Sequence, residues 1–229
     1  MRLLNKVING ISPVYKEVAV ETQRHIDNLL KPIGSLGRLE DIAARISSIT
    51  GKVSNKLDKK CVVVFASDNG ICEEGVSGAP ASVTITQFLN MTKGLTGINV
   101  FSSQAGSDVI LVDVGVNGDL PYDQIVNKKI RRGTRNMLKE AAMTRQEAVQ
   151  ALETGIDMVR ELVAQNYMVI GTGEMGIGNT STSATVIMSL TGRSAEEVVG
   201  KGVGMLEPDY QHKKEVLKEL KTAEEYGCK

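Results

Sequence analysis

Short apolar runs alternate along the chain with longer segments in which apolar residues recur every three or four positions. Residues 61–66 and 109–114 are rich in apolar and β-branched side chains, which is typical of parallel strands covered on both faces. Residues 167–170 form a third candidate strand. Strands that alternate with helical segments favour an α/β fold, in which a mostly parallel sheet has helices on both faces.

Helical periodicity, capping boxes and proline positions predict the segments between the strands. A capping box at residues 144–147 begins one helix, and Pro208 stands in the first turn of the last helix, with Gly227 as its expected C-cap. The predicted helices cover residues 16–31, 36–51, 82–91, 144–165, 181–190, 194–199 and 208–226. The residues of the fourth helix expected to face inward are Ala148, Leu152, Ile156, Val159 and Val163. Residues 98–101 are expected to form a short strand, and residues 116–143 a loop rich in glycine and charge.

Length and charge limit the classes of function. The 229 residues are enough for one α/β domain or two small ones with a buried core. Lys+Arg and Asp+Glu are equal at 27 each, so no overall charge attracts the chain to nucleic acid or to an anionic membrane. Aromatic residues make up only 3%, which disfavours stacking platforms for single-stranded nucleic acid. We therefore expect neither a nucleic-acid nor a membrane partner.

Three cysteines, an odd number without metal-ligand spacing, argue against a secreted disulfide framework. The first residues show no signal-peptide pattern, and no stretch approaches the roughly 18 apolar residues that span a bilayer. These features predict a soluble protein of the cytoplasm. Cys72 is expected to be an ordinary small residue, and His25 and His212 are expected to lie at the surface.

A glycine-rich run at residues 171–180 follows the third candidate strand and precedes a predicted helix. It matches the G-x-G-x-x-G dinucleotide pattern, but the acidic residue expected on a second strand about 20 residues later is missing. A Walker loop is excluded because no lysine precedes Thr180 and Ser181. Two interpretations stay open: N–H groups at this helix N-terminus bind a phosphate, or the run is a tight structural turn. Glu174 would bind ribose hydroxyls in the first and face solvent in the second.

The loop at residues 67–80 is too long for a tight turn and carries Asp68, Glu73 and Glu74. Loops of this length in a compact domain are often functional. The three acids lack the alternating spacing of a calcium loop, so no metal site is predicted. A basic run at residues 128–135 is expected to be a solvated loop rather than an anion site.

Four blocks of residues occur in order between about residue 20 and residue 218. They are Lys31-Pro32-x-Gly34-Ser35-Leu36-Gly37-x-Leu39-Glu40; Ser67-Asp68-Asn69-Gly70 with Glu74-Gly75-Val76-Ser77, Pro80, Val83-Thr84 and Gln87; Gly173-Glu174-Met175-Gly176-Ile177-Gly178-Asn179-Thr180; and Gly200 to Gly204 followed by Lys213. Together they resemble the nicotinate-nucleotide:dimethylbenzimidazole phosphoribosyltransferase family.

The resemblance implies a pentosyltransferase of cobalamin biosynthesis. Such enzymes transfer the 5-phosphoribosyl group of nicotinate mononucleotide to 5,6-dimethylbenzimidazole or a related base, giving α-ribazole 5′-phosphate and nicotinate. The resemblance also implies a homodimer that uses no metal and no organic cofactor, with Glu174 as the candidate catalytic residue. The residues that it implies for binding the nucleotide phosphate are Gly176, Gly178, Asn179, Thr180 and Lys213. Those that it implies for binding the azole base are Ser77, Pro80 and Gln87.

The chain departs from the family in one respect. In the family a glutamate in a Gly-Glu-Gly-Thr-Gly segment further along the chain takes the azole proton, and these 229 residues contain no such segment. Residues 1–55 are thus expected to be the N-terminal helical part of an incomplete small subdomain, and residues 56–229 an α/β nucleotide-binding domain without the family's C-terminal region. Three interpretations stay open: a truncated or split enzyme completed by a second chain, a full enzyme that uses Glu174 or Asp68 as base, or a module that binds nucleotide or azole without turnover.

Overall fold

The computed structural model describes residues 2–220 and divides the chain into two compact units, Met1–Asp58 and Lys59–Lys229. The first unit is helical, with α1 (Arg2–Asn9), α2 (Lys16–Asp27) and α3 (Arg38–Thr50). Helices α2 and α3 pack against each other. That the two units are a small subdomain and a nucleotide-binding domain stays a prediction.

A buried ion pair shapes the turn between α2 and α3. Lys31 Nζ lies 2.8 Å from Glu40 Oε1, and both side chains are largely buried. The same carboxylate oxygen accepts a hydrogen bond from Leu36 N at 3.1 Å. The bonds from Lys31 and then from Leu36 lower the pKa of Glu40. Residues of the first block of the family resemblance, Lys31, Leu36 and Glu40, therefore stabilise this turn.

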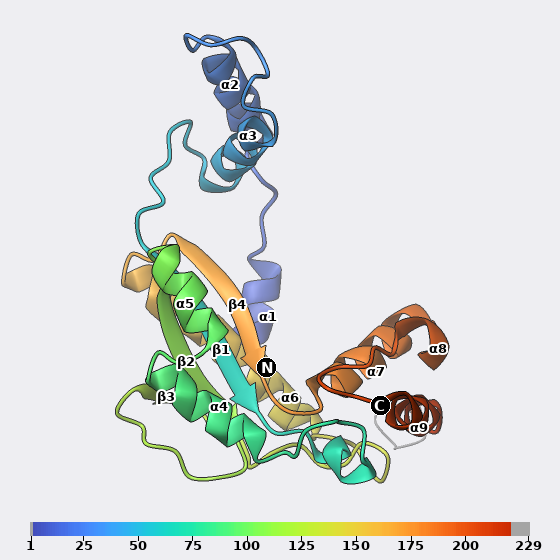
Figure 1. Cartoon of the computed structure of the whole chain (residues 1–229). Helices are drawn as coiled ribbons and strands as arrows, with labels where there is room; N and C mark the ends of the chain where they lie inside the picture. Colours follow the sequence, from blue (N-terminus) through green and yellow to red (C-terminus); the bar gives the residue numbers. More distant parts are fainter. Residues whose placement is uncertain (1, 221–229) are drawn as a thin grey trace. The chain divides into compact units, whose positions relative to one another are not determined.

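The second unit is built on a four-stranded sheet. Its strands are β1 (Lys60–Ser67), β2 (Asp108–Gly115), β3 (Ile125–Asn127) and β4 (Val169–Met175). They lie in the order β3-β2-β1-β4, and every neighbouring pair is parallel. Helices α4 (Val83–Thr92) and α5 (Gly97–Gln104) cover one face, and α6 (Arg145–Ala164) covers the other (Figure 1). This arrangement confirms the predicted α/β fold.

Each face of the sheet has its own core, because successive side chains of a strand point to opposite faces. Phe88 of α4 is fully buried in a cluster with Val64 and Leu111. Met158 and Leu162 of α6 are buried in the cluster on the opposite face. The sheet is therefore held from both sides, and its carboxyl end is a rigid platform for the loops that follow the strands.

A third cluster lies beyond the carboxyl end of β4 (Figure 1). It joins the short helix η1 (Gly70–Glu74) to three C-terminal helices, α7 (Asn179–Thr191), α8 (Ala195–Val198) and α9 (Glu207–Lys218). Ile71 of η1, Ala184 of α7 and Leu217 of α9 are all buried in it. This packing brings α9 against the loops that follow β1 and β4.

The observed strands differ most from the predicted ones at three places. The strand predicted at residues 98–101 is wrong, because Thr96 begins a helix with a capping box and these residues belong to α5. The short strand β3 lies in the segment predicted as loop. Strand β4 begins later than predicted and continues through the glycine-rich run to Met175. Gly171 and Gly173 pass close to side chains of β1, where an added Cβ would lie 3.3 Å and 3.2 Å from valine methyl carbons.

Helix limits differ most from the prediction in α2 and α9, and by no more than two residues in the other predicted helices. Helix α2 ends at Asp27, and α9 ends at Lys218 rather than near residue 226. The predicted C-cap Gly227 lies outside the described residues. Pro208 does stand in the first turn of α9, as predicted.

Helix α6 begins where predicted but packs through a different face. Thr144 and Glu147 form the predicted capping box. Three of the residues predicted to face inward are exposed, namely Leu152, Val159 and Val163. Met158 and Leu162, one helical turn apart, pack on the sheet instead. Apolar residues occur on two stripes of this helix, so the sequence pattern alone could not select the buried one.

Candidate functional site

The loops that follow β1 and β4 meet at the carboxyl edge of the sheet. Ala66 of β1 pairs with Met175 of β4, so the two strands end side by side. A Cβ added to Gly176 would lie 2.1 Å from the carbonyl oxygen of Ser67, so only glycine fits there. Ligands of parallel α/β sheets bind at this edge.

The segment after β4 ends in the N-terminus of α7. Gly178 has a φ of 86°, a left-handed conformation that favours glycine, and it is the N-cap of α7. Among residues 2–220, no backbone acceptor is found for the N–H groups of Gly178 and Thr180. Free N–H groups and the helix dipole together favour an anion at such a terminus.

A buried cation lies beside this helix terminus. Lys213 of α9 is 0% exposed, and its Nζ donates to Thr180 Oγ1 at 2.7 Å. Within the part of the chain that the structure describes, Lys213 forms no ion pair with a carboxylate. Burial lowers the pKa of its ammonium group. An ammonium group has three donors, so it can bind an anion in addition to the Thr180 hydroxyl.

Two cavities lie against these loops. The smaller, of about 110 Å³, we call the anion cavity; it is lined by Val76, Ser77, Gly78, Met175, Gly176, Ile177, Gly178, Asn179, Thr180, Lys201, Gly202 and Val203. The larger, of about 770 Å³, we call the loop cavity; its lining includes Asp68, Asn69, Cys72, Ser77, Pro80, Ile85 and Asn117. Ser77 and Gly78 line both. The two cavities therefore adjoin each other at these two residues.

Asp68 is the buried carboxylate of the loop cavity. Its side chain is only 7% exposed, and Oδ2 accepts a hydrogen bond from Asn117 N at 2.7 Å. Its Oδ1 is buried and has no hydrogen-bond partner among the described residues. Burying a carboxylate oxygen without a hydrogen bond costs free energy. Asp68 Oδ1 therefore retains the capacity to accept a hydrogen bond.

The structure brings most of the predicted site residues together. Gly176, Gly178, Asn179 and Thr180 line the anion cavity, and Lys213 contacts Thr180. Ser77 and Pro80 line the loop cavity. Three predicted residues line neither cavity: Gln87, half-buried on α4, Glu174, exposed on β4, and Lys213, fully buried on α9. Asn179 Nδ2 donates to Glu174 Oε1. The roles assigned to these residues stay predictions.

Sequence reasoning gave no role to Cys72 and Thr84, which contact the glycine-rich segment. Cys72 Sγ donates to the carbonyl oxygen of Ile177 at 3.2 Å, and Thr84 Oγ1 accepts from Ile177 N at 3.0 Å. Burial, followed by the charge of Asp68, raises the pKa of the Cys72 thiol, which disfavours the nucleophilic thiolate. These contacts join residues that are distant in sequence, and no local pattern could have revealed them.

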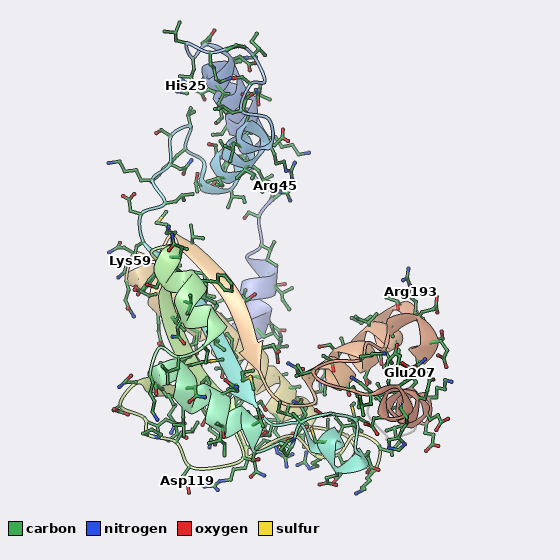
Figure 2. The ribbon with its side chains drawn as sticks, in the orientation of Figure 1. His25, Arg45, Lys59, Asp119, Arg193 and Glu207 are labelled. Atoms are coloured by element: carbon green, nitrogen blue, oxygen red, sulfur yellow. The ribbon has the colours of Figure 1, made fainter. Side chains whose placement is uncertain are left out.

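The basic run at residues 128–135 is paired with carboxylates, and of its five cations only Arg132 is exposed. Its five cations each form an ion pair with a carboxylate: Lys128 with Glu161, Lys129 with Asp113, Arg131 and Arg135 with Glu147, and Arg132 with Asp119. Asp119 lies on the loop that follows β2 (Figure 2). The prediction of a solvated loop is wrong for four of these side chains, which are half-buried, and Arg131 Nε and Nη1 are buried without a hydrogen bond among the described residues.

The described residues offer neither a metal cluster nor a membrane span. Between residues 2 and 220, no three side chains of His, Cys, Asp or Glu gather in a way that could hold a metal ion. No helix in that range is both long and apolar enough to cross a bilayer. His25 and His212 are exposed, as expected.

Comparison with known proteins gives consistent matches. A family model described as phosphoribosyltransferase matches residues 11–225. The chain is similar to the nicotinate-nucleotide--dimethylbenzimidazole phosphoribosyltransferase of Clostridium tetani, with 48% identity over 219 residues, which are 96% of this chain and 60% of that protein. The protein of the same name from Clostridium acetobutylicum is 47% identical over 216 residues, which are 94% and 61% of the two chains. The crystal structure of CobT from Thermus thermophilus matches with a TM-score of 0.84 and 37% identity, covering 89% of this chain and 61% of that one. The chain spans about 60% of the length of these relatives.

Proposed function

Because the chain belongs to the phosphoribosyltransferase family, we propose that it forms the nucleotide- and base-binding part of an enzyme that transfers the phosphoribosyl group of nicotinate mononucleotide to 5,6-dimethylbenzimidazole. The observation that carries the proposal is the buried Lys213 ammonium at the N-terminus of α7, without a carboxylate partner among the described residues. A phosphate group supplies the negative charge that this position lacks.

The proposed reaction exchanges one C–N bond for another. The bond between ribose C1′ and the pyridinium nitrogen breaks, its electron pair stays on that nitrogen, and nicotinate leaves. A bond forms between C1′ and a nitrogen of the azole, which gives up a proton to a base, and α-ribazole 5′-phosphate results. Reactions of this kind depend mainly on positioning, on electrostatic stabilisation and on removal of the azole proton.

In this proposal, one cavity binds the phosphate of the nucleotide and the other binds the azole. The 5′-phosphate lies in the anion cavity, where Lys213 and the N–H groups of Gly178 and Thr180 bind it. The azole lies in the loop cavity, against Ser77 and Pro80. In this proposal ribose C1′ lies beside Ser77, which lines both cavities, so that the azole nitrogen can reach it.

A second candidate function is binding of nucleotide and base without turnover by this chain alone. The placement of Glu174 favours it, because this carboxylate is exposed and lines neither cavity. Asp68 does line the loop cavity, with Oδ2 on Asn117 N and Oδ1 without a partner among the described residues, so formation of product by this chain would assign the base to Asp68. Under this proposal, a second chain with the Gly-Glu-Gly-Thr-Gly segment supplies the base.

Two further parts of the proposal concern assembly and location. The family resemblance supports a homodimer, with assembly with such a second chain as the alternative, and the three cysteines without metal-ligand spacing support a place in the cytoplasm. Light scattering of the purified chain, alone and with added nicotinate mononucleotide, tests the homodimer: a mass of one chain under both conditions would contradict it.

Incubation of the purified chain with nicotinate mononucleotide and dimethylbenzimidazole, followed by chromatography, tests the main proposal. Formation of α-ribazole 5′-phosphate and nicotinate in equal amounts supports transfer by this chain and overturns the second candidate. Binding of the nucleotide in a calorimeter without product supports the second candidate. Absence of nucleotide binding contradicts both.

A further inference from the structure

The backbone of Ile177 is held on both sides, by two residues of the loop after β1 and by one residue of α4. Its N–H donates to Thr84 Oγ1 at 3.0 Å. Its carbonyl oxygen accepts from Asn69 Nδ2 at 2.9 Å and from Cys72 Sγ at 3.2 Å. We call these three contacts the Ile177 clamp. They fix one residue of the anion cavity from two directions.

Thr84 is the rigid side of this clamp. Its side chain is fully buried in the first turn of α4. One turn later on the same helix, Phe88 is fully buried in the core against the sheet. Helix α4 therefore cannot shift without opening that core, and the Thr84 hydroxyl is held at a constant position.

The clamp lies directly before the anion-binding groups. Gly178 follows Ile177, takes the left-handed φ of 86° and caps α7. The peptide that carries the Gly178 N–H is the same peptide whose carbonyl oxygen Asn69 holds. The direction of the N–H groups of Gly178 and Thr180 thus depends on how Ile177 is held.

We propose that Thr84 is a positioning residue for the phosphate site: it touches no ligand itself, but it orients the Ile177–Thr180 backbone so that its N–H groups face the anion cavity. The inference rests on the proposed function, because it takes a phosphate as the ligand of that cavity. It adds a role for Thr84, which lines neither cavity.

Thr84→Val tests the inference, because valine keeps the shape and removes the acceptor for Ile177 N. We expect an affinity for inorganic phosphate about tenfold weaker by calorimetry, and faster amide exchange at Ile177. Thr84→Ser keeps the hydroxyl and should restore both readouts. Thr86→Val is the matched control on α4, since the Thr86 hydroxyl is exposed and donates only to Ser82 O.

Unchanged phosphate affinity in Thr84→Val, with the wild-type chain binding phosphate, overturns the inference. An equal loss in Thr84→Ser also overturns it, because the effect would then come from packing rather than from the hydroxyl. If the wild-type chain binds no phosphate, the proposed function fails and the inference fails with it. The amide exchange of Ile177 separates these failures, since it reports the clamp without any ligand.

Discussion

Replacing Lys213 with methionine should stabilise the ligand-free chain and remove most of its affinity for phosphate. The ammonium is fully buried, bonds to Thr180 Oγ1 and has no carboxylate partner among the described side chains. An uncompensated buried charge costs several kcal/mol, whereas the lost hydrogen bond to Thr180 is worth about 1 kcal/mol. Methionine has similar length and no charge, so we expect a net gain of about 1–3 kcal/mol in the free energy of unfolding.

The stability gained by Lys213→Met should decrease as the pH rises. Burial lowers the pKa of Lys213 in the folded chain below its ordinary value of 10.5. Between the two pKa values the unfolded chain binds more protons, so the stability of the wild type rises with pH there. The cost of the buried charge is complete below the folded pKa and is relieved as the pH approaches 10.5. The advantage of Lys213→Met over wild type therefore shrinks toward high pH.

Urea unfolding of both proteins, near neutral pH and near pH 10, measures this difference. Calorimetry with inorganic phosphate should show a loss of about tenfold to a hundredfold, the value of one charge-assisted hydrogen bond. Lys218→Met on the same helix is the control, because Lys218 is half exposed and pairs with Glu196 at the surface. A destabilised Lys213→Met protein, or one that binds phosphate as well as wild type, would refute the reasoning.

Three further predictions concern glycine fit, pH and the candidate catalytic residue. Gly176→Ala should lower the free energy of unfolding by more than about 3 kcal/mol, because the added Cβ would lie 2.1 Å from Ser67 O. Gly155→Ala in α6, where an added Cβ meets no atom within 4 Å, should raise the free energy of unfolding by about 0.5–1 kcal/mol. Urea unfolding of both variants measures the two effects. The pKa of Glu147 is lowered from its ordinary value of 4.5 to about 2, first by the hydrogen bond from the Thr144 backbone N–H. Its carboxylate should therefore stabilise the fold by about 3 kcal/mol at most above pH 4.5, and this stabilisation should be lost as the pH falls toward 2. Acid unfolding of Glu147→Gln and of wild type should show this difference, and equal acid stability would contradict the role of the capping box. Glu174→Gln should leave stability within about 0.5 kcal/mol, since its side chain is exposed, and should weaken binding of nicotinate mononucleotide; equal nucleotide affinity would remove Glu174 from the site.

The parts of the fold that depend on local pattern could be predicted. The apolar runs that became β1 and β2, the capping box of α6 and the helix N-terminus after Gly178 all have signals within a few residues. The strand at 98–101 failed because the apolar residues there did not distinguish a strand from a helix, and the Thr96 capping box decided it.

The site could be predicted less completely, because its geometry joins distant segments. The glycine-rich run at residues 171–180 has a local pattern, and the resemblance supplied Lys213, which lies 33 residues from Thr180 in sequence. The contact of Thr84 with Ile177 spans 93 residues, and although both belong to the blocks of the family resemblance, nothing in the sequence indicates that they touch. Only packing of α4 on the sheet brings them together. The burial of Lys213 likewise results from the cluster that joins α9 to η1 and α7.

The central claim is that the segment from Gly176 to Thr180, with Lys213, binds the 5′-phosphate of nicotinate mononucleotide. Calorimetric titration of the chain with nicotinate mononucleotide and with nicotinate riboside, which lacks only the phosphate, tests it most directly. The account predicts that the nucleotide binds at least about a hundredfold more tightly, because the riboside leaves Lys213 and two N–H groups without their anion. Equal affinity for the two ligands would contradict it.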